Sequence, residues 1–271
     1  MSVRVAIAGA GGRMGQALID ATLAAGDLSL TAALDVAGSA LLGHDAGERI
    51  GRPCGVMVTD DIASAIAGSD VLVDFTRPEG TLAHAAQCAR RGVALVAGTT
   101  GLSATQKAEL ASHGRSIPIV FAPNMSVGVN VLARLVGLAA SRLGPGYDVE
   151  VVEMHHRHKV DAPSGTALLL GDAAATARGT TLAEAGVFAR EGTTGPRKAG
   201  SIGFATLRGG DVVGEHTVIF ATEGERVELS HRATSRQTFA GGALRAARFV
   251  AAKRAAGEPG MYDMTDVLDL R

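Results

Sequence analysis

The sequence predicts an α/β protein in which a Rossmann-type, doubly wound parallel sheet is joined to a second, α+β domain built on a mixed or antiparallel sheet. Two observations lead to this fold class. In the first half, short β-branched runs alternate with helical stretches, a pattern typical of parallel strands joined by crossover helices. In the second half, three strand-like runs follow one another with only short turns between them.

The first half gives strand and helix signals in a regular order. A first helix is expected over residues 12–25, ending near Gly26. Ser103, with Gln106 three residues later, indicates a capping box that opens a helix ending near His113. Strands are expected at residues 3–7 and 30–34 and, after a polar, glycine-rich stretch over 38–55, at 56–59, 71–75, 93–97 and 117–121. Each of these last four strands should lead into a turn and then a helix.

The alternation of strand and helix signals ends near Pro123. A long helix is expected over residues 127–143 and should stop at Gly144-Pro145, because both residue types terminate helices. The later elements expected are a strand over 147–154, a helix over 165–177, a loop over 190–200, strands over 201–207, 213–221 and 226–233, and a helix over 238–254.

Composition narrows the class of protein. With 46% hydrophobic and 20% charged residues, a chain of 271 residues can bury a substantial core. The formal net charge of -1 provides no global field to attract nucleic acid or a membrane surface, and no apolar run approaches membrane-spanning length. Cys54 and Cys88 match no disulfide or metal-ligand spacing, which favours reduced thiols and a cytoplasmic location.

A glycine-rich loop lies between the first strand and the first helix. Gly9, Gly12 and Gly15 fit the spacing G-x-x-G-x-x-G, whereas Met14 breaks the more usual G-x-G-x-x-G. Such a turn lets a pyrophosphate reach the helix N-terminus. Asp35 ends the second strand 20 residues after Gly15, where a ribose-binding acid is expected. A turn that only packs helix against strand is the alternative, and Asp35 favours dinucleotide binding over it.

Asp35 also bears on the choice of cofactor. A carboxylate there bonds ribose hydroxyls and repels a 2′-phosphate, and the next residue is Val36 rather than a basic one. Arg13 could still reach a phosphate, so NADH is favoured and NADPH stays open. Turns after two later strands, at residues 75–80 and 98–101, should face the same crevice.

The most informative segment spans residues 155–166. In this segment a basic run is followed by hydroxyl side chains and backbone amides at the start of a helix. Such groups together can bind a small substrate with two negative charges. A metal site is an alternative for three histidines, but the adjacent Arg157 and Lys159 would repel a cation. A solvated basic loop is another alternative. The segment carries His155, His156, Arg157, His158 and Lys159, followed by Ser164, Gly165 and Thr166 at a helix start.

Two side chains in this segment are candidates for moving protons. A nicotinamide-dependent reductase needs a protein acid that neutralises the developing anion. Histidine titrates in the right range without tuning, which suits His155. A lysine crowded by other cations can deliver a proton near neutrality, which suits Lys159.

Taken together, these residues resemble the 4-hydroxy-tetrahydrodipicolinate reductase family, long named dihydrodipicolinate reductases. The resemblance covers essentially the whole chain, and its last segment is the most specific. The segments that carry it are residues 9–15, 74–78, 98–101, 124–130 and 153–166.

The resemblance implies an activity and an assembly. The reaction would be the NAD(P)H-dependent reduction of (2S,4S)-4-hydroxy-2,3,4,5-tetrahydrodipicolinate to (S)-2,3,4,5-tetrahydrodipicolinate with loss of water, in lysine biosynthesis through the diaminopimelate pathway. NADH is expected to be favoured or comparable to NADPH, with no metal. A cytoplasmic homotetramer is expected, with a dinucleotide-binding domain of residues 1–126 and 236–271 and a substrate-binding and oligomerisation domain of residues 127–235.

The resemblance also implies roles for single residues. His155 would be the acid/base and Lys159 the proton donor, while His156, Ser164, Gly165 and Thr166 would hold substrate carboxylates. The cofactor would be bound by Gly9, Ala10, Gly11, Gly12, Arg13, Met14, Asp35, Arg77, Gly98, Thr99, Thr100, Ala122, Pro123, Asn124 and Met125.

Two alternatives differ in function. A related two-domain reductase for another small acid, such as an amino-acid dehydrogenase, would be expected to lack the 155–166 segment. A non-catalytic dinucleotide sensor would keep the glycine loop but lose the proton donor. Lys159 in its full motif argues against the sensor.

Overall fold

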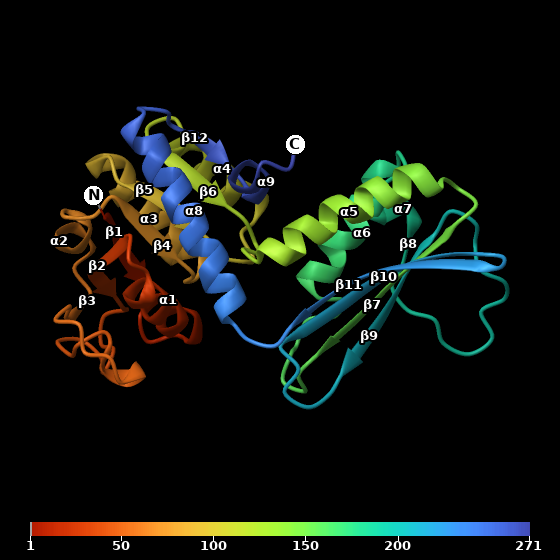
Figure 1. Cartoon of the computed structure of the whole chain (residues 1–271), viewed down its shortest axis with the longest axis horizontal. Coiled ribbons are helices and arrows are strands. Elements are labelled where there is room, and N and C mark those ends of the chain that lie inside the picture. The colour runs from red at the N-terminus through yellow and green to blue at the C-terminus, as the bar shows by residue number, and fades with distance from the viewer. Residues whose placement is uncertain (1) are drawn as a thin grey trace. The chain divides into compact units, whose positions relative to one another are not determined.

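The computed structural model describes residues 2–271, and the chain divides into two compact units. The first comprises the chain up to Val127 together with Arg236–Arg271, and the second comprises Gly128–Ser235. Each unit has its own sheet (Figure 1). The α/β fold class, with one parallel and one mixed sheet, is confirmed.

The sheet of the first unit is parallel throughout, in the order β12-β6-β5-β4-β1-β2-β3. From β1 the chain moves one way to β2 and β3, then crosses over to β4, β5 and β6 on the other side. Ligands of open α/β sheets bind at such a switch point, outside the carboxyl ends of the strands. The strands are β1 (Val3–Ala8), β2 (Leu28–Leu34), β3 (Val58–Thr59), β4 (Val71–Asp74), β5 (Ala94–Ala97), β6 (Pro118–Phe121) and β12 (Gly260–Tyr262).

Helices cover both faces of this sheet (Figure 1). Val5 and Ile7 of β1 belong to the core that contains α1 and α8 side chains, whereas Ala6 and Ala8 belong to the core that contains α3 and α4 side chains. Alternate residues of the strand therefore pack into two separate cores, one on each face of the sheet, as a doubly wound sheet requires. The helical segments are α1 (Arg13–Ala24), η1 (Glu48–Ile50), α2 (Ile62–Ile66), α3 (Pro78–Arg91), α4 (Ala104–His113), α8 (Gln237–Ala255) and α9 (Met264–Leu268).

Several helix boundaries follow directly from local sequence. The capping box is confirmed: Ser103 Oγ accepts a hydrogen bond from Gln106 N at 3.2 Å, and Gln106 Oε1 accepts one from Ser103 N at 2.9 Å. The helices α5 (Val127–Leu143) and α6 (Gly165–Ala177) begin and end at the predicted residues. Gly144, which follows α5, has a φ of 74°, a left-handed conformation that favours glycine.

The second unit has a mixed sheet in the order β11-β10-β7-β9-β8. β7 pairs antiparallel with β10 and parallel with β9. Side chains of α5 and α6 share a core with one face of the sheet. Besides these helices, the unit contains α7 (Leu182–Ala185) and the strands β7 (Asp148–His155), β8 (Gly186–Val187), β9 (Ile202–Arg208), β10 (Gly214–Thr222) and β11 (Glu225–Ala233).

The strand order and several short elements, among them η1, α7 and β8, differ from the sequence prediction. β9 and β10 follow each other in sequence but are not neighbours, because β7 lies between them. The fully buried Val149 and Val151 suit β7 to this central place. The three-residue strand β12, parallel to β6, was not predicted because so short a run shows no periodicity. Over residues 2–271, none of the helices is long and apolar enough to cross a membrane.

Candidate functional site

The predicted cofactor residues of the first unit all follow parallel strands that neighbour one another. We call the residues at these carboxyl ends the cofactor edge. They lie between β1 and α1 (Gly9, Ala10, Gly11, Gly12, Arg13 and Met14), after β2 (Asp35), after β4 (Arg77), after β5 (Gly98, Thr99 and Thr100) and after β6 (Ala122, Pro123, Asn124 and Met125). The topology therefore brings this predicted set to one edge of the sheet.

The glycine loop leaves no room for side chains at two positions. A Cβ at Gly15 would lie 2.0 Å from Gly9 O, and one at Gly11 would lie 2.5 Å from Asp35 Oδ2. Gly9 has a φ of 77°, which favours glycine. Gly12 is the N-cap residue of α1, and in the described chain no side chain at this position makes a capping hydrogen bond. The backbone thus presents an uncapped helix N-terminus, which suits a pyrophosphate.

Asp35 is held firmly beside this loop. Its Oδ2 accepts hydrogen bonds from Gly11 N at 3.1 Å and Ser39 Oγ at 3.0 Å, and its Oδ1 accepts one from Val36 N at 2.9 Å. The Val36 side chain is 72% exposed. An oriented carboxylate followed by an apolar side chain suits free ribose hydroxyls better than a 2′-phosphate.

A cavity of about 290 Å³ opens at the cofactor edge. It includes Phe75 and Thr76, which belong to the turn expected to face this crevice, and Phe239, which the sequence did not single out. Phe75 lies so close to Gly98 that a Cβ there would be 2.2 Å from the ring. Phe239 belongs to α8, far away in sequence, so nothing in the local pattern could reveal it. The cavity is lined by Met14, Phe75, Thr76, Gly98, Thr99, Thr100, Pro123, Asn124, Met125 and Phe239.

The turn after β4 is fixed by a buried carboxylate. Asp74 Oδ1 accepts hydrogen bonds from both N and Oγ1 of Thr76, each at 2.7 Å. Its Oδ2 lies 2.7 Å from His84 Nδ1. Because Asp74 is fully buried, these contacts hold Thr76 in its place at the cavity wall.

In the second unit, polar residues gather near the end of β7, in what we call the His155 cluster: Glu153, His155, His156, Lys159, Ser164, Arg208 and His216. The backbone of the basic segment is hydrogen-bonded to the turn before β10. Gly209 N donates to His155 O at 2.9 Å, and His156 N donates to Val212 O at 2.7 Å. The segment is therefore an ordered part of the unit and not a loose basic loop.

Lys159 has an acidic partner, although the sequence predicts only cations around it. Its Nζ lies 2.8 Å from Asp161 Oδ1. Both residues are close in sequence, and the turn between them brings the charges together. The ammonium group is thus oriented by a carboxylate, which corrects the expectation of crowding by cations alone.

His155 is held by a buried carboxylate. Its Nδ1 lies 2.5 Å from Glu153 Oε2, and Glu153 is only 1% exposed. Arg208 binds the same carboxylate through both ends of its guanidinium, at 2.9 and 3.0 Å. Burial alone would raise the pKa of Glu153, but hydrogen bonds from Arg208 and His155 outweigh it and lower the pKa. No local pattern points to Arg208, whereas Glu153 lies in the segment that carries the family resemblance.

Ser164 has a structural role within the cluster. It is 1% exposed, and its Oγ accepts the hydrogen bond that caps α6 from Ala167 N at 3.1 Å. The same Oγ lies 3.0 Å from His216 Nε2. Its contact with substrate stays a prediction, and in the structure the hydroxyl is buried and bonded within the protein.

The backbone at the start of α6 remains suited to an anion. A Cβ at Gly165 would meet no atom within 4 Å, so open space lies over this position, and Thr166 is half-buried beside it. Among the described residues, His156 Nδ1 is buried without a hydrogen-bond partner. Helix amides and a donor of this kind can bind a carboxylate.

His216 completes the cluster behind His155. The two rings meet edge to face with centroids 5.0 Å apart. Burial lowers the pKa of His216 to about 3, with His155 adding to the effect, so this ring is neutral near pH 7. Within residues 2–271, no three His, Cys, Asp or Glu side chains converge as a metal site.

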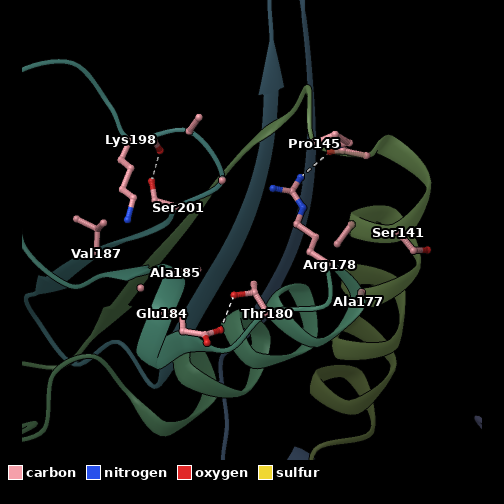
Figure 2. A pocket seen from close by; sticks show the side chains of 15 residues that line it. Ser141, Pro145, Ala177, Arg178, Thr180, Glu184, Ala185, Val187, Lys198 and Ser201 are labelled. Carbon is pink, nitrogen blue, oxygen red and sulfur yellow. Dashed lines mark hydrogen bonds between the residues drawn. The ribbon is translucent and has the colours of Figure 1, made fainter.

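A larger pocket of about 660 Å³ lies elsewhere in the second unit, between the ends of α5 and α6 and the strand β8 (Figure 2). Two of its polar side chains have partners within the protein. Arg178 Nη2 donates to Gly144 O at 3.0 Å, and Thr180 Oγ1 donates to Glu184 Oε2 at 3.0 Å. It contains none of the predicted site residues, so the candidate substrate site is the His155 cluster.

Comparison with known proteins finds similar sequences that extend over both units. Residues 3–125 match the family model for the N-terminus of dihydrodipicolinate reductase, and residues 128–268 match the model for its C-terminus. The 4-hydroxy-tetrahydrodipicolinate reductase of Nitrosospira multiformis is 58% identical over 100% of this chain and 99% of its own length. The one from Ralstonia nicotianae is 57% identical over 99% of this chain and 100% of its own length.

A solved structure is also similar. It is a dipicolinate-bound dihydrodipicolinate reductase from Paenisporosarcina sp. TG-14, with 26% sequence identity and a TM-score of 0.76. The match covers 98% of this chain and 99% of that chain.

Proposed function

The chain belongs to the dihydrodipicolinate reductase family, and from that premise we propose how its own residues serve the reaction. It is an NAD(P)H-dependent oxidoreductase that converts (2S,4S)-4-hydroxy-2,3,4,5-tetrahydrodipicolinate to (S)-2,3,4,5-tetrahydrodipicolinate in lysine biosynthesis. The reaction takes up a hydride and a proton and releases water. The observation that carries the residue assignment is the His155 cluster, where a histidine, a lysine and an open helix N-terminus lie together.

The cofactor edge is proposed to hold the pyridine nucleotide, which supplies the hydride when bound. The N-terminus of α1 would receive the pyrophosphate, because Gly12 leaves that end uncapped within the described chain. Asp35 would accept hydrogen bonds from ribose hydroxyls. Since Asp35 is followed by the exposed Val36, NADH should be used at least as well as NADPH, with no metal required.

The substrate is a small dicarboxylate, and its carboxylates are proposed to bind at the start of α6. The backbone amides of Gly165 and Thr166 lie in the first turn of α6, at the positive end of the helix dipole. His156 adds a side-chain donor. Ser164 would contribute by capping the helix and keeping those amides in place, in agreement with its burial.

Proton handling is assigned to His155 and Lys159. Lys159 Nζ, oriented by Asp161 at 2.8 Å, is the proposed proton donor. His155 is 7% exposed and has one ring nitrogen bonded to Glu153, so its other nitrogen is the one able to exchange a proton. The two groups separate proton donation from proton acceptance.

We also propose a cytoplasmic homotetramer assembled through the second unit's sheet. The face opposite α5 and α6 carries apolar side chains: Val152 and Met154 of β7, Leu207 of β9 and Ile219 of β10. Leu207 is 45% exposed, and within residues 2–271 no helix covers this face (Figure 1). Light scattering should give the mass of four chains, and the double variant Leu207→Asp, Ile219→Asp should give a smaller species.

The activity is tested with enzymatically generated 4-hydroxy-tetrahydrodipicolinate and either NADH or NADPH. We expect loss of reduced-nicotinamide absorbance with both donors, at a rate with NADH no lower than with NADPH. Mass spectrometry should show a product that has lost the 4-hydroxyl. If both cofactors bind and neither is oxidised, the assignment fails.

A further inference from the structure

The Glu153 carboxylate has every acceptor position filled. Oε2 receives His155 Nδ1 and Arg208 Nη1, while Oε1 receives Ser164 N and Arg208 Nη2. A carboxylate offers about four such positions, and an ionised one can only accept. With Glu153 1% exposed, no solvent competes for these bonds. This buried group therefore fixes the orientation of whatever donates to it.

This arrangement sets the tautomer of His155. Because Glu153 only accepts, the hydrogen of the neutral ring must be on Nδ1, which leaves Nε2 as the free base. Nε2 points toward the backbone of β10, where a Cβ at Gly214 would be 3.0 Å away. The glycine at this position leaves the reactive nitrogen its space.

Arg208 changes the net charge next to the His155 ring. A lone buried carboxylate beside a histidine would favour the imidazolium form, as a nearby opposite charge does. Here the guanidinium forms a bidentate pair with Glu153 and offsets its charge. Burial lowers the pKa of His155, Glu153 raises it, and Lys159 and Arg208 lower it further; the overall direction is down.

Other elements packed near His155 add few opposing charges. On the basic segment, Asp161 is paired with Lys159, and its backbone oxygen accepts from Arg208 Nη2 at 2.6 Å. On β10, His216 is neutral, with a pKa of about 3. On β11, His231 lies near His216, and burial lowers its pKa too. Arg208 is thus the fixed cation that balances Glu153.

We propose that Glu153 and Arg208 are a positioning pair for catalysis: Glu153 holds His155 with its hydrogen on Nδ1, and Arg208 offsets the Glu153 charge so that Nε2 stays unprotonated in the resting enzyme. The proposal rests on the assignment of His155 to proton handling. It makes the resting His155 a proton acceptor and leaves donation to Lys159.

The pair can be tested by removing each charge separately. In the full-length enzyme labelled with ¹⁵N and ¹³C histidine, the His155 ring is assigned by its absence in His155→Asn, and its titration is followed by NMR. Arg208→Met should move the titration midpoint of His155 up by about 1 pH unit, because Glu153 is then unbalanced. Glu153→Gln should move it down, because Arg208 is then unpaired. The acid limb of the pH profile of kcat/KM should move in the same two directions.

Further variants separate charge from folding. Arg208→Gln is neutral but can still donate a hydrogen bond, so it should raise the midpoint as Arg208→Met does, even if the methionine variant folds poorly. Arg208→Lys keeps the charge and should leave the midpoint near that of the wild type. Arg248→Met, which removes another bidentate partner of a carboxylate, Asp27 in the first unit, should change neither readout.

Specific results would overturn the proposal. Shifts in the same direction for Glu153→Gln and Arg208→Gln, or none in either, would show that the pair does not set the charge of His155. Wild-type ¹⁵N shifts showing the neutral hydrogen on Nε2 would do so as well. If the NMR midpoints move as expected while the kinetic profile does not, the positioning role in catalysis is refuted and the assignment of His155 to proton handling fails with it.

Discussion

The cofactor edge and the His155 cluster, the two proposed ligand sites, are built from different kinds of chemical group. The first is built from glycine backbone, small hydroxyl side chains and one oriented carboxylate at the ends of parallel strands. The second is built from ionisable side chains, several of them buried and bonded to one another. A site that only has to hold a large ligand can rely on backbone shape, whereas a site that moves protons needs side chains with controlled charge.

This contrast predicts that changes in the two regions have separable effects. The most damaging single change should be Lys159→Ala in the His155 cluster. Loss of the proposed proton donor should lower kcat by about 10²- to 10⁴-fold, while the Kd for NADH stays the same. Stopped-flow oxidation and NADH fluorescence measure the two quantities. Lys198→Ala, at the separate pocket of the same unit, is the matched control and should retain full turnover. An equal loss in both variants would refute the role of Lys159.

At the cofactor edge, Gly15→Ala should have the next largest effect. The new methyl group would meet Gly9 O at 2.0 Å, so the loop must shift. Overpacking of this kind costs about 1–3 kcal/mol, and we expect at least about a 10-fold rise in the Kd for NADH. Gly26→Ala is the control, since a Cβ there meets nothing within 4 Å. Unchanged NADH affinity in Gly15→Ala would show that the loop does not shape the cofactor site.

Titration of a histidine in the His155 cluster should also make the free energy of unfolding depend on pH. His216 has a folded pKa of about 3, against 6.5 for an unperturbed histidine, so the unfolded chain binds a proton more readily. Stability from this group is complete above pH 6.5 and is lost as pH falls toward 3. Between pH 6.5 and 5 the loss is about 2 kcal/mol. Urea unfolding at equal protein concentration should show a smaller acid loss in His216→Asn than in wild type; equal losses would contradict this.

The smallest effect is expected at the rim of the cofactor edge. Val36→Arg places a cation next to Asp35, where it can pair with a 2′-phosphate. We expect kcat/KM with NADPH to rise about 10-fold relative to NADH, equivalent to about 1.4 kcal/mol. The ratio of the two rates in one preparation is the measurement, and NADH serves as the internal control. A ratio that does not change would mean that the side chain at position 36 does not face the ribose.

The placement of the residues at the cofactor edge follows from the sequence more directly than the placement of those in the His155 cluster. Glycine spacing and a strand-end acid are local signals, and the parallel topology then brings Asp35 and Gly98 to one edge. The cluster depends on pairings between distant segments. Arg208 reaches Glu153 only because β9 lies beside β7, and that neighbour relation is not encoded in either segment alone. For the same reason, Phe239 and the burial of Ser164 could not be anticipated.

The division of roles between the two regions is tested most directly by measuring the binding affinity of two ligands for two variants. NADH is titrated alone, and dipicolinate, a dicarboxylate related to the substrate, is titrated at saturating NADH. We predict that Gly15→Ala weakens NADH binding and leaves dipicolinate binding unchanged, while His156→Gln does the reverse. Loss of affinity for both ligands in both variants would contradict the account.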